Sequence, residues 1–401
     1  MRYITADYIF PITSAPIKNG IIQIDDDGKI ISISEQPHPD NYRDSNLKLQ
    51  TLKGIIVPGF INAHCHLELS HLKDQIKPGT GLAGFIKEIL AIRNNYALEL
   101  IQQTIIDAEK EMFDNGIVAV ADISNDDYTF AKKATSKIYF HTLIEAFDIV
   151  KERAEQMFQH CVDLGEQLKN IAPQNANHSI VPHAPYTVTP TLFELIKNLA
   201  AKNNSIQSIH NQECEAESEL FKNKSGAMYD LFANAGLAMQ QFEATGKNSL
   251  QSVLTLMNSE SKTLLVHNTF TDKQDIEWAH QHHRKLYWCF CPNANLYIEN
   301  RLPQFENFIS TKAKCCIGTD SYTSNWSLSV LDELKTISKH NPSIPLQTKL
   351  TWATINGAEY LDIEKTFGSI EAGKKPGLNL IENIDLENLQ LTASSSVKKI
   401  I

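Results

Sequence analysis

The chain has 401 residues, of which 42% are hydrophobic and 21% are charged, so it can bury a large core and is not globally disordered. Its 37 basic and 47 acidic side chains give a net charge of −10, which argues against nucleic-acid binding and favours a small-molecule partner. With no apolar run near the ~20 residues of a membrane span, no signal-peptide pattern and an odd, scattered set of 7 cysteines, we expect a cytoplasmic protein without membrane association or a disulfide framework.

Both ends of the chain carry short β-strand patterns. Apolar residues at 21–24 and 30–33 flank an Asp-Gly turn, which is a strong signal for a β-hairpin. The segment that begins at Gly368 is also strand-like and rich in turns. We therefore predict two domains: a small β-sandwich-like domain of residues 1–55 and 367–401, and a catalytic domain of residues 56–366.

The middle of the chain alternates strand patterns with helical patterns. Apolar residues at 3-4-3-4 spacing predict a helix over residues 98–115, and cap signals predict helices that begin at Thr189-Pro190 and at Thr271. Strands interleaved with helices in this way predict a (β/α)₈ TIM-type barrel. The alternative is a doubly wound open sheet, but no Gly-x-Gly-x-x-Gly follows the first strand. The predicted strands are residues 54–66, 117–123, 137–145, 179–184, 205–211, 262–268, 285–291 and 314–320.

Polar side chains recur where these strands end. His64 and His66 stand two residues apart, so they point to the same side of the first strand and can converge on one metal ion. Four later strands also end in histidine or aspartate, at the face where barrel enzymes place their catalytic groups. We treat these residues as one constellation: His183, His210 with Glu213 three residues later, His267, and Asp320 with Ser321.

Together these segments resemble the amidohydrolase superfamily, in its cytosine deaminase and chlorohydrolase-like branch. The resemblance covers essentially the whole chain. It rests on Pro-Gly-Phe-Ile-Asn-Ala-His-Cys-His up to His66, Pro-His-Ala-Pro around His183, His-x-x-Glu from His210, Cys-Pro-Asn-Ala-Asn up to Asn295, Gly-Thr-Asp up to Asp320, and Gly-Ser-Ile-Glu-x-Gly-Lys from Gly368.

The resemblance implies a ligand set and a division of roles. It implies metal ligation by His64, His66, His210 and Asp320, a proton-shuttle role for Glu213, a position for His267 beside the attacking water, and substrate contact by His183. We also expect Asp320 to act in catalysis by accepting a hydrogen bond from the water, and Glu68 and Ser321 to face the substrate, with an ion-pair role as the alternative for Glu68. A core role for His183 and a purely structural role for His267 are the alternatives.

One zinc ion per chain, or one iron ion, is the implied cofactor. Neutral imidazoles and a carboxylate suit zinc, and zinc lowers the pKa of a bound water towards ~7. Binuclear members of the superfamily use a carboxylated lysine at the end of strand four. This chain has His183 there and no lysine within the strand, which favours one ion.

The implied activity is hydrolytic deamination of an aminated N-heterocycle, with release of ammonia. We favour a 6-aminopurine nucleoside, with aminodeoxyfutalosine preferred over methylthioadenosine and S-adenosylhomocysteine. The carboxylate of aminodeoxyfutalosine needs a cationic partner, for which Arg93 and Arg301 are candidates. The alternatives are a guanine- or pterin-type deaminase, a chlorohydrolase or cyclic-amide hydrolase, and a non-catalytic binding protein. The resemblance also suggests a homodimer.

Overall fold

The computed structural model describes residues 1–35, 49–236, 239 and 242–401, which form two compact units. The terminal unit consists of residues 1–62, 110–120 and 329–401, and the central unit of residues 63–109 and 121–328. The predicted domain limits at residues 55 and 367 remain a prediction, and residues 36–48 of the predicted small domain lie outside the described residues.

The terminal unit contains the predicted hairpin, formed by β4 (Ile21–Ile24) and antiparallel β5 (Ile30–Ser34). Gly28 in its turn has a φ of +77°, which glycine adopts without strain. The remaining strands are β1 (Arg2–Thr5), β2 (Tyr8–Ile9), β3 (Ile17–Lys18), β6 (Leu49–Thr51), β7 (Ile55–Pro58), β16 (Leu378–Glu382) and β17 (Ser396–Lys399), and the helices of this unit are α12 (Val330–His340), α13 (Leu346–Trp352) and α14 (Ile355–Tyr360). The two sheets have the orders β5-β4-β1-β6 and β17-β16-β7-β2-β3, so the second joins strands from both ends of the chain.

The first predicted strand of the middle segment is wrong as a single element. β7 ends at Pro58, and β8 (Phe60–Cys65) begins after Gly59. A Cβ on Gly59 would lie 2.3 Å from a methyl carbon of Val118 and 2.7 Å from the carbonyl oxygen of Pro376, so only glycine fits this crossing. The chain bends there from one sheet into the next, although the apolar run continues through the bend.

The other predicted strands of the middle segment are confirmed to within three residues at each end. They are β9 (Ile117–Ser124), β10 (Tyr139–Ala146), β11 (His178–Pro182), β12 (Gln207–Asn211), β13 (Thr263–His267), β14 (Leu286–Phe290) and β15 (Cys315–Ile317). Within the described residues they form sheets of order β11-β10-β9-β8 and β12-β13-β14-β15. The pairs β10–β11, β12–β13, β13–β14 and β14–β15 are parallel.

Backbone hydrogen bonds link the edges of these two sheets within the central unit. The N–H of His210 on β12 donates to the carbonyl of His183, just after β11, at 3.0 Å. The N–H of Thr319, just after β15, donates to the carbonyl of His64 on β8, also at 3.0 Å. Both links lie at the carboxyl ends of the strands, so the predicted site residues are held by sheet-like bonding on both edges.

The predicted helices are present, with one correction at a cap. α2 (Leu98–Asp114) and α5 (Pro190–Asn203) are confirmed, and the Thr189 side chain caps α5 by accepting from the N–H of Leu192. α9 (Lys273–His282) is capped by Asp272 and not by Thr271, whose hydroxyl donates instead to the buried side chain of Gln212 at 2.6 Å. The other helices are α1 (Gly81–Ile92), α3 (Phe130–Lys133), α4 (Ala154–Ile171), α6 (Glu215–Asn223), α7 (Ala227–Asn234), α8 (Ser249–Val253), α10 (Pro292–Glu299) and α11 (Phe305–Ser310).

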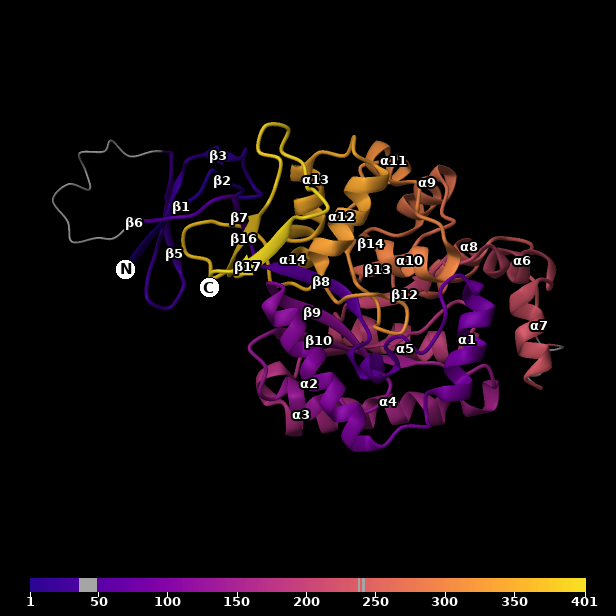
Figure 1. Cartoon of the computed structure of the whole chain (residues 1–401). Coiled ribbons are helices and arrows are strands. Elements are labelled where there is room, and N and C mark those ends of the chain that lie inside the picture. Colours follow the sequence, from indigo (N-terminus) through magenta and orange to yellow (C-terminus); the bar gives the residue numbers. More distant parts are fainter. Residues whose placement is uncertain (36–48, 237–238, 240–241) are drawn as a thin grey trace. The chain divides into compact units, whose positions relative to one another are not determined.

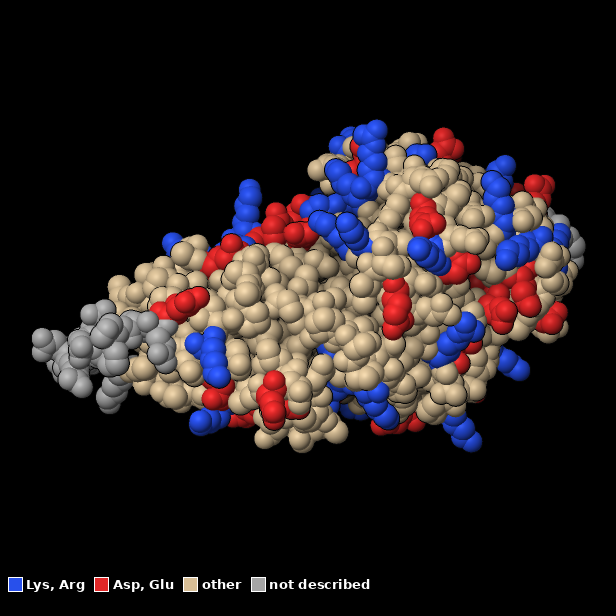
Figure 2. Space-filling model, turned by 90° about the horizontal axis from the view of Figure 1, so that it is seen from above, with Lys and Arg blue, Asp and Glu red and all other residues tan. Residues whose placement is uncertain are grey.

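Helices cover the strands of the central unit, with α4 packed on β10 and α5 on β11 (Figure 1). Among the described helices, none is both long enough and apolar enough to cross a bilayer. All 7 cysteines are free and buried. On the face displayed in Figure 2, basic and acidic side chains are interspersed.

A fully buried ion pair connects elements of the central unit. Lys133 Nζ lies 2.6 Å from Asp122 Oδ2 and also donates to the hydroxyls of Ser124 and Thr142, at 3.1 and 3.0 Å. The other oxygen of Asp122 accepts from the N–H of Leu67 at 2.9 Å, directly after His66. The pair therefore fixes the chain just beyond the first two predicted ligands.

We predict that Lys133→Met lowers the free energy of unfolding by about 3–5 kcal/mol, because it leaves the Asp122 carboxylate buried without a compensating charge. Urea unfolding measures this change. Lys110→Met is the matched control, since Lys110 pairs with Asp114 on the solvent-exposed side of α2 and its loss should have little effect. Equal stability of the two variants would contradict the prediction.

Candidate functional site

Four predicted ligands come together at the carboxyl ends of the central strands. His64 Nε2 lies 3.1 Å from His66 Nε2, which lies 3.3 Å from His210 Nε2. Asp320 Oδ1 lies 3.6 Å from His64 Nε2 and 3.5 Å from His66 Nε2. All four side chains are buried. We call His64, His66, His210 and Asp320 the donor group.

The spacing of the donor group fits one metal ion. Atoms that lie 2.0–2.1 Å from a shared tetrahedral ion are roughly 3.3–3.4 Å apart, which is close to the separations found here. Burial lowers the pKa of His66 to about 4 and holds the pKa of His210 well below its usual range. These imidazoles are therefore neutral near pH 7, which is the form that binds a metal.

The acidic member of the donor group is ionised. Burial alone would raise the pKa of Asp320, but the hydrogen bond from His64 and the nearby imidazoles hold that pKa well below its usual range. The hydroxyl of Ser324 also donates to Asp320 Oδ2 at 2.5 Å. Asp320 is one of the residues with a positive φ, at +57°, so a strained backbone aims its side chain at the histidines.

Neighbouring polar groups orient two of the histidines. Nδ1 of His210 lies 2.7 Å from the carbonyl oxygen of His183, so it carries the proton and leaves Nε2 free towards His66. Nδ1 of His267 lies 3.0 Å from Asn295 Oδ1, which fixes that ring in the same way. His267 also has a positive φ, of +72°.

Glu213 lies beside the donor group and pairs with His267. Its Oε1 is 3.6 Å from His267 Nε2, and both side chains are buried. The carboxylate of Glu217 accepts the N–H groups of Gln212 and Glu213 at 2.9 and 3.1 Å, which fixes this turn after β12. Burial, Asp320 and Glu217 raise the pKa of Glu213 well above its usual range, so Glu213 can hold a proton and deliver it.

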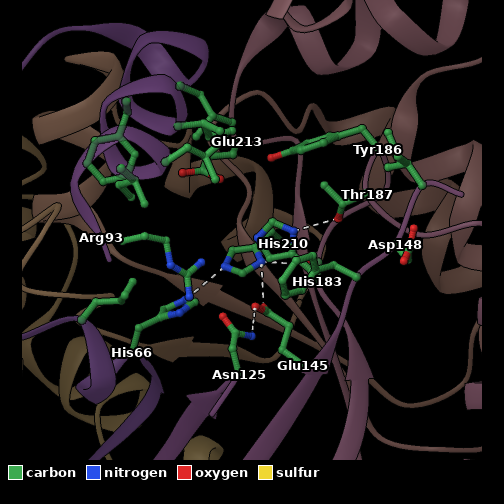
Figure 3. Close-up of a pocket in the computed structure, with 18 of the residues that line it drawn as sticks. His66, Arg93, Asn125, Glu145, Asp148, His183, Tyr186, Thr187, His210 and Glu213 are labelled. Atoms are coloured by element: carbon green, nitrogen blue, oxygen red, sulfur yellow. Dashed lines mark hydrogen bonds and ion pairs between the residues drawn. The ribbon is translucent and has the colours of Figure 1, made fainter. Parts of the chain in front are cut away.

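His66, His210 and Asp320 of the donor group line a cavity of about 730 Å³, which is within the range of small-molecule sites. Figure 3 shows His66 and His210 in this cavity. The α1 face with Leu82, Phe85, Ile86 and Ile89 forms an apolar wall. Tyr186 and Phe232 add aromatic surface, with ring centroids 5.9 Å apart. This lining suits a flat ring with an apolar substituent.

The predicted substrate contacts differ in where they lie. His183 and Ser321 line the cavity, and His183 Nδ1 lies 2.8 Å from the hydroxyl of Thr187. Glu68 lies instead in a neighbouring cavity of about 220 Å³, where its carboxylate accepts the N–H of Asn125 at 2.9 Å. Burial raises the pKa of Glu68 to about 8.

Sequence reasoning did not assign the apolar wall of α1 or the contact of Asn295 with His267. The wall had a signal, because residues 82, 85, 86 and 89 recur at helical spacing. Asn295 is the last residue of the Cys-Pro-Asn-Ala-Asn motif, but the sequence indicates no role for its side chain. Its contact depends on how the start of α10 approaches β13, which a linear pattern does not show.

Residues 55–400 match the model of the amidohydrolase family. The chain belongs to the amidohydrolase family. An adenosine deaminase from Helicobacter pylori is 26% identical to this amidohydrolase over 368 residues, which cover 88% of this chain and 85% of that protein.

Two solved structures share the fold of this amidohydrolase. The H. pylori aminofutalosine deaminase in complex with methylthio-coformycin matches 100% of both chains, with a TM-score of 0.81 and 22% identity. An adenosine deaminase from Xanthomonas campestris with bound zinc has a TM-score of 0.70 and 20% identity, over 96% of this chain and 85% of that one.

We predict that His66→Ala sharply reduces the metal content of this amidohydrolase, because it removes a nitrogen that lies within 3.5 Å of each of the other three donor atoms. Elemental analysis of purified protein measures the loss. His282→Ala is the control, since His282 is exposed and stacks on Trp278 at the end of α9. A His66→Ala protein with a full complement of metal would remove His66 from the donor group.

Proposed function

We propose that this amidohydrolase is a metal-dependent deaminase that replaces the exocyclic amino group of an N-heterocycle with oxygen and releases ammonia. The observation that carries the proposal is the position of Glu213, a carboxyl group with a raised pKa that pairs with His267 beside the donor group. The adjoining cavity has room and aromatic surface for a heterocycle. The names of the similar deaminases support the same activity.

The donor group would hold one ion per chain, either zinc or iron. The bound zinc in the similar adenosine deaminase from X. campestris supports zinc. Such an ion supplies a Lewis acid that activates water at neutral pH. Glu213 takes the proton of the attacking water and passes it to the ring nitrogen next to the reacting carbon. His267, held by Asn295, orients the water and Glu213. The second proton of the water then passes to the amino group, the C–N bond breaks and ammonia leaves.

The favoured substrate is a 6-aminopurine nucleoside, with aminodeoxyfutalosine ahead of methylthioadenosine and S-adenosylhomocysteine. The cavity is large enough for a nucleoside with a substituent, and Tyr186 and His183 lie where they can stack on or hydrogen-bond to a purine. The similarity to an adenosine deaminase and to an aminofutalosine deaminase supports this class.

We also propose that the two central sheets close into the predicted (β/α)₈ barrel. The links from His210 to His183 and from Thr319 to His64 support closure, because they join the two pairs of sheet edges. A small β domain from both termini, a homodimer and a cytoplasmic location remain predictions from the sequence.

We predict that Glu213→Gln slows ammonia release by roughly 10²–10⁴-fold and leaves the metal content unchanged, because glutamine keeps the shape and loses the proton. A steady-state ammonia assay with parallel elemental analysis measures both quantities. Glu215→Gln, an exposed change two residues away at the start of α6, is the matched control. Near-normal turnover by Glu213→Gln would exclude Glu213 from proton transfer.

We predict that kcat/KM is highest for aminodeoxyfutalosine among that compound, methylthioadenosine, S-adenosylhomocysteine and guanine, since this ratio reports discrimination directly. A preference for guanine of more than about tenfold would rule out the nucleoside assignment. Chloride release from a chlorinated triazine, without ammonia from any of these compounds, would support a chlorohydrolase instead.

A further inference from the structure

Each carboxyl group that lines the large cavity has a polar side-chain contact, whereas one cation in the described part of the chain has none. The Asp148 carboxylate accepts from Arg153, whose Nε lies 2.9 Å away, and Glu145 accepts from the side chain of Asn125 at 3.0 Å. Glu213 pairs with His267, and Asp320 belongs to the donor group. Among the described residues, the guanidinium of Arg93 has no ion pair and no hydrogen bond, although it lines the cavity.

The position of Arg93 in the sequence explains why it faces the cavity. It is the C-cap of α1, with its N–H donating to the carbonyl of Ile89 at 2.9 Å. It follows Leu82, Ile86 and Ile89 at spacings of four, three and four residues, so it continues the apolar wall of the same helix face. A helix C-terminus favours a cation, but this accounts for neither the half-burial of Arg93 nor its place in the wall.

The backbone of Arg93 is held from outside the cavity. His71 Nε2 lies 3.3 Å from the carbonyl oxygen of Arg93, and His71 Nδ1 lies 3.2 Å from the carbonyl oxygen of Glu68. The carboxylate of Glu68 is committed to the N–H groups of Asn125 and Asp126. Arg93 also borders the smaller cavity, where its charge partly offsets the burial that raises the pKa of Glu68, but no ion pair with a described residue neutralises the guanidinium. Figure 3 shows it on the same side of the cavity as His66, across from Tyr186 and Asp148.

Two other arginines, Arg153 and Arg301, are less suitable partners for an anionic ligand. Arg153 is already held by both oxygens of Asp148, at 2.9 and 3.0 Å. Arg301, the second candidate from the sequence, lies over the ring of Phe270 with 4.3 Å between the guanidinium carbon and the ring centroid, and it does not line the cavity. Arg93 is thus the cation that remains free to meet a ligand here.

We propose that Arg93 selects a substrate with an ionised carboxylate on an apolar group, by pairing its guanidinium with that carboxylate. The inference rests on the proposed deaminase function and names its substrate class. A planar guanidinium matches a carboxylate with two parallel hydrogen bonds, and the surrounding leucine, isoleucine and phenylalanine side chains match an apolar carrier. A phosphate dianion calls for more than one free cation, and Arg153 is already paired.

Binding of reaction products tests Arg93 without requiring turnover. The probes are the 6-oxo product of aminodeoxyfutalosine and its primary carboxamide, which has a similar shape and no charge. We expect calorimetry to show that the metal-loaded wild type binds the acid about 10- to 100-fold more tightly than the carboxamide. Arg93→Met should lose this preference. Arg93→Lys should keep part of it, since lysine retains the charge without the planar fork.

The ratio of the affinities for the acid and the carboxamide separates recognition of the carboxylate from structural damage, because a distorted cavity weakens the binding of both compounds alike. Lys87→Met, on the exposed side of α1, and Arg301→Met are the matched controls and should keep the wild-type ratio. Equal affinity of the wild type for both compounds, or a preference that survives in Arg93→Met, overturns the inference.

A parallel assay follows the conversion of 6-aminopurine to 6-oxopurine by absorbance. Conversion without any preference for the acid overturns the role of Arg93 and leaves the deaminase proposal standing. Conversion together with an Arg93-dependent preference supports both. If the metal-loaded wild type neither converts the nucleosides nor binds either product, both proposals are overturned.

Discussion

The site depends on keeping the imidazoles of His66 and His210 neutral and the carboxylate of Asp320 ionised, although these groups lie within a few ångströms of each other. Burial achieves the first requirement, because it disfavours protonation of His66 and His210. The imidazoles around Asp320 achieve the second, against the effect of burial on that residue. Neutral imidazole nitrogens and an ionised carboxylate are the donors that a divalent cation needs.

Neighbouring groups hold the side chains of the site in the orientations that this arrangement requires. The carbonyl of His183 and the side chain of Asn295 fix the rings of His210 and His267, and the hydroxyl of Ser324 fixes Asp320. The buried pair of Lys133 and Asp122 holds the chain just after His66. Such outer partners orient metal ligands and tune their basicity. They lie on different strands and loops, so the geometry depends on the whole central unit.

The sequence predicted much of this arrangement because strand periodicity and strand-end polar residues are local signals. His64, His66, His210 and Asp320 were assigned together, and the structure brings them together. The bend at Gly59 was missed because it depends on close approach to Val118 and Pro376, which are distant in sequence. Glu68 was expected to face the substrate; the turn after β8 places its carboxylate against the N–H of Asn125 in a smaller cavity, and its contact with substrate stays a prediction.

The wall of the cavity on α1 has a consequence for how substrate preference can change. The donor group lies at the ends of β8, β12 and β15, whereas one face of a single helix supplies the apolar wall of the cavity. Replacing a few side chains on that face would alter the fit for a substituent and leave the chemistry in place. In this architecture a new specificity can arise in small steps, each of which preserves a working reaction centre.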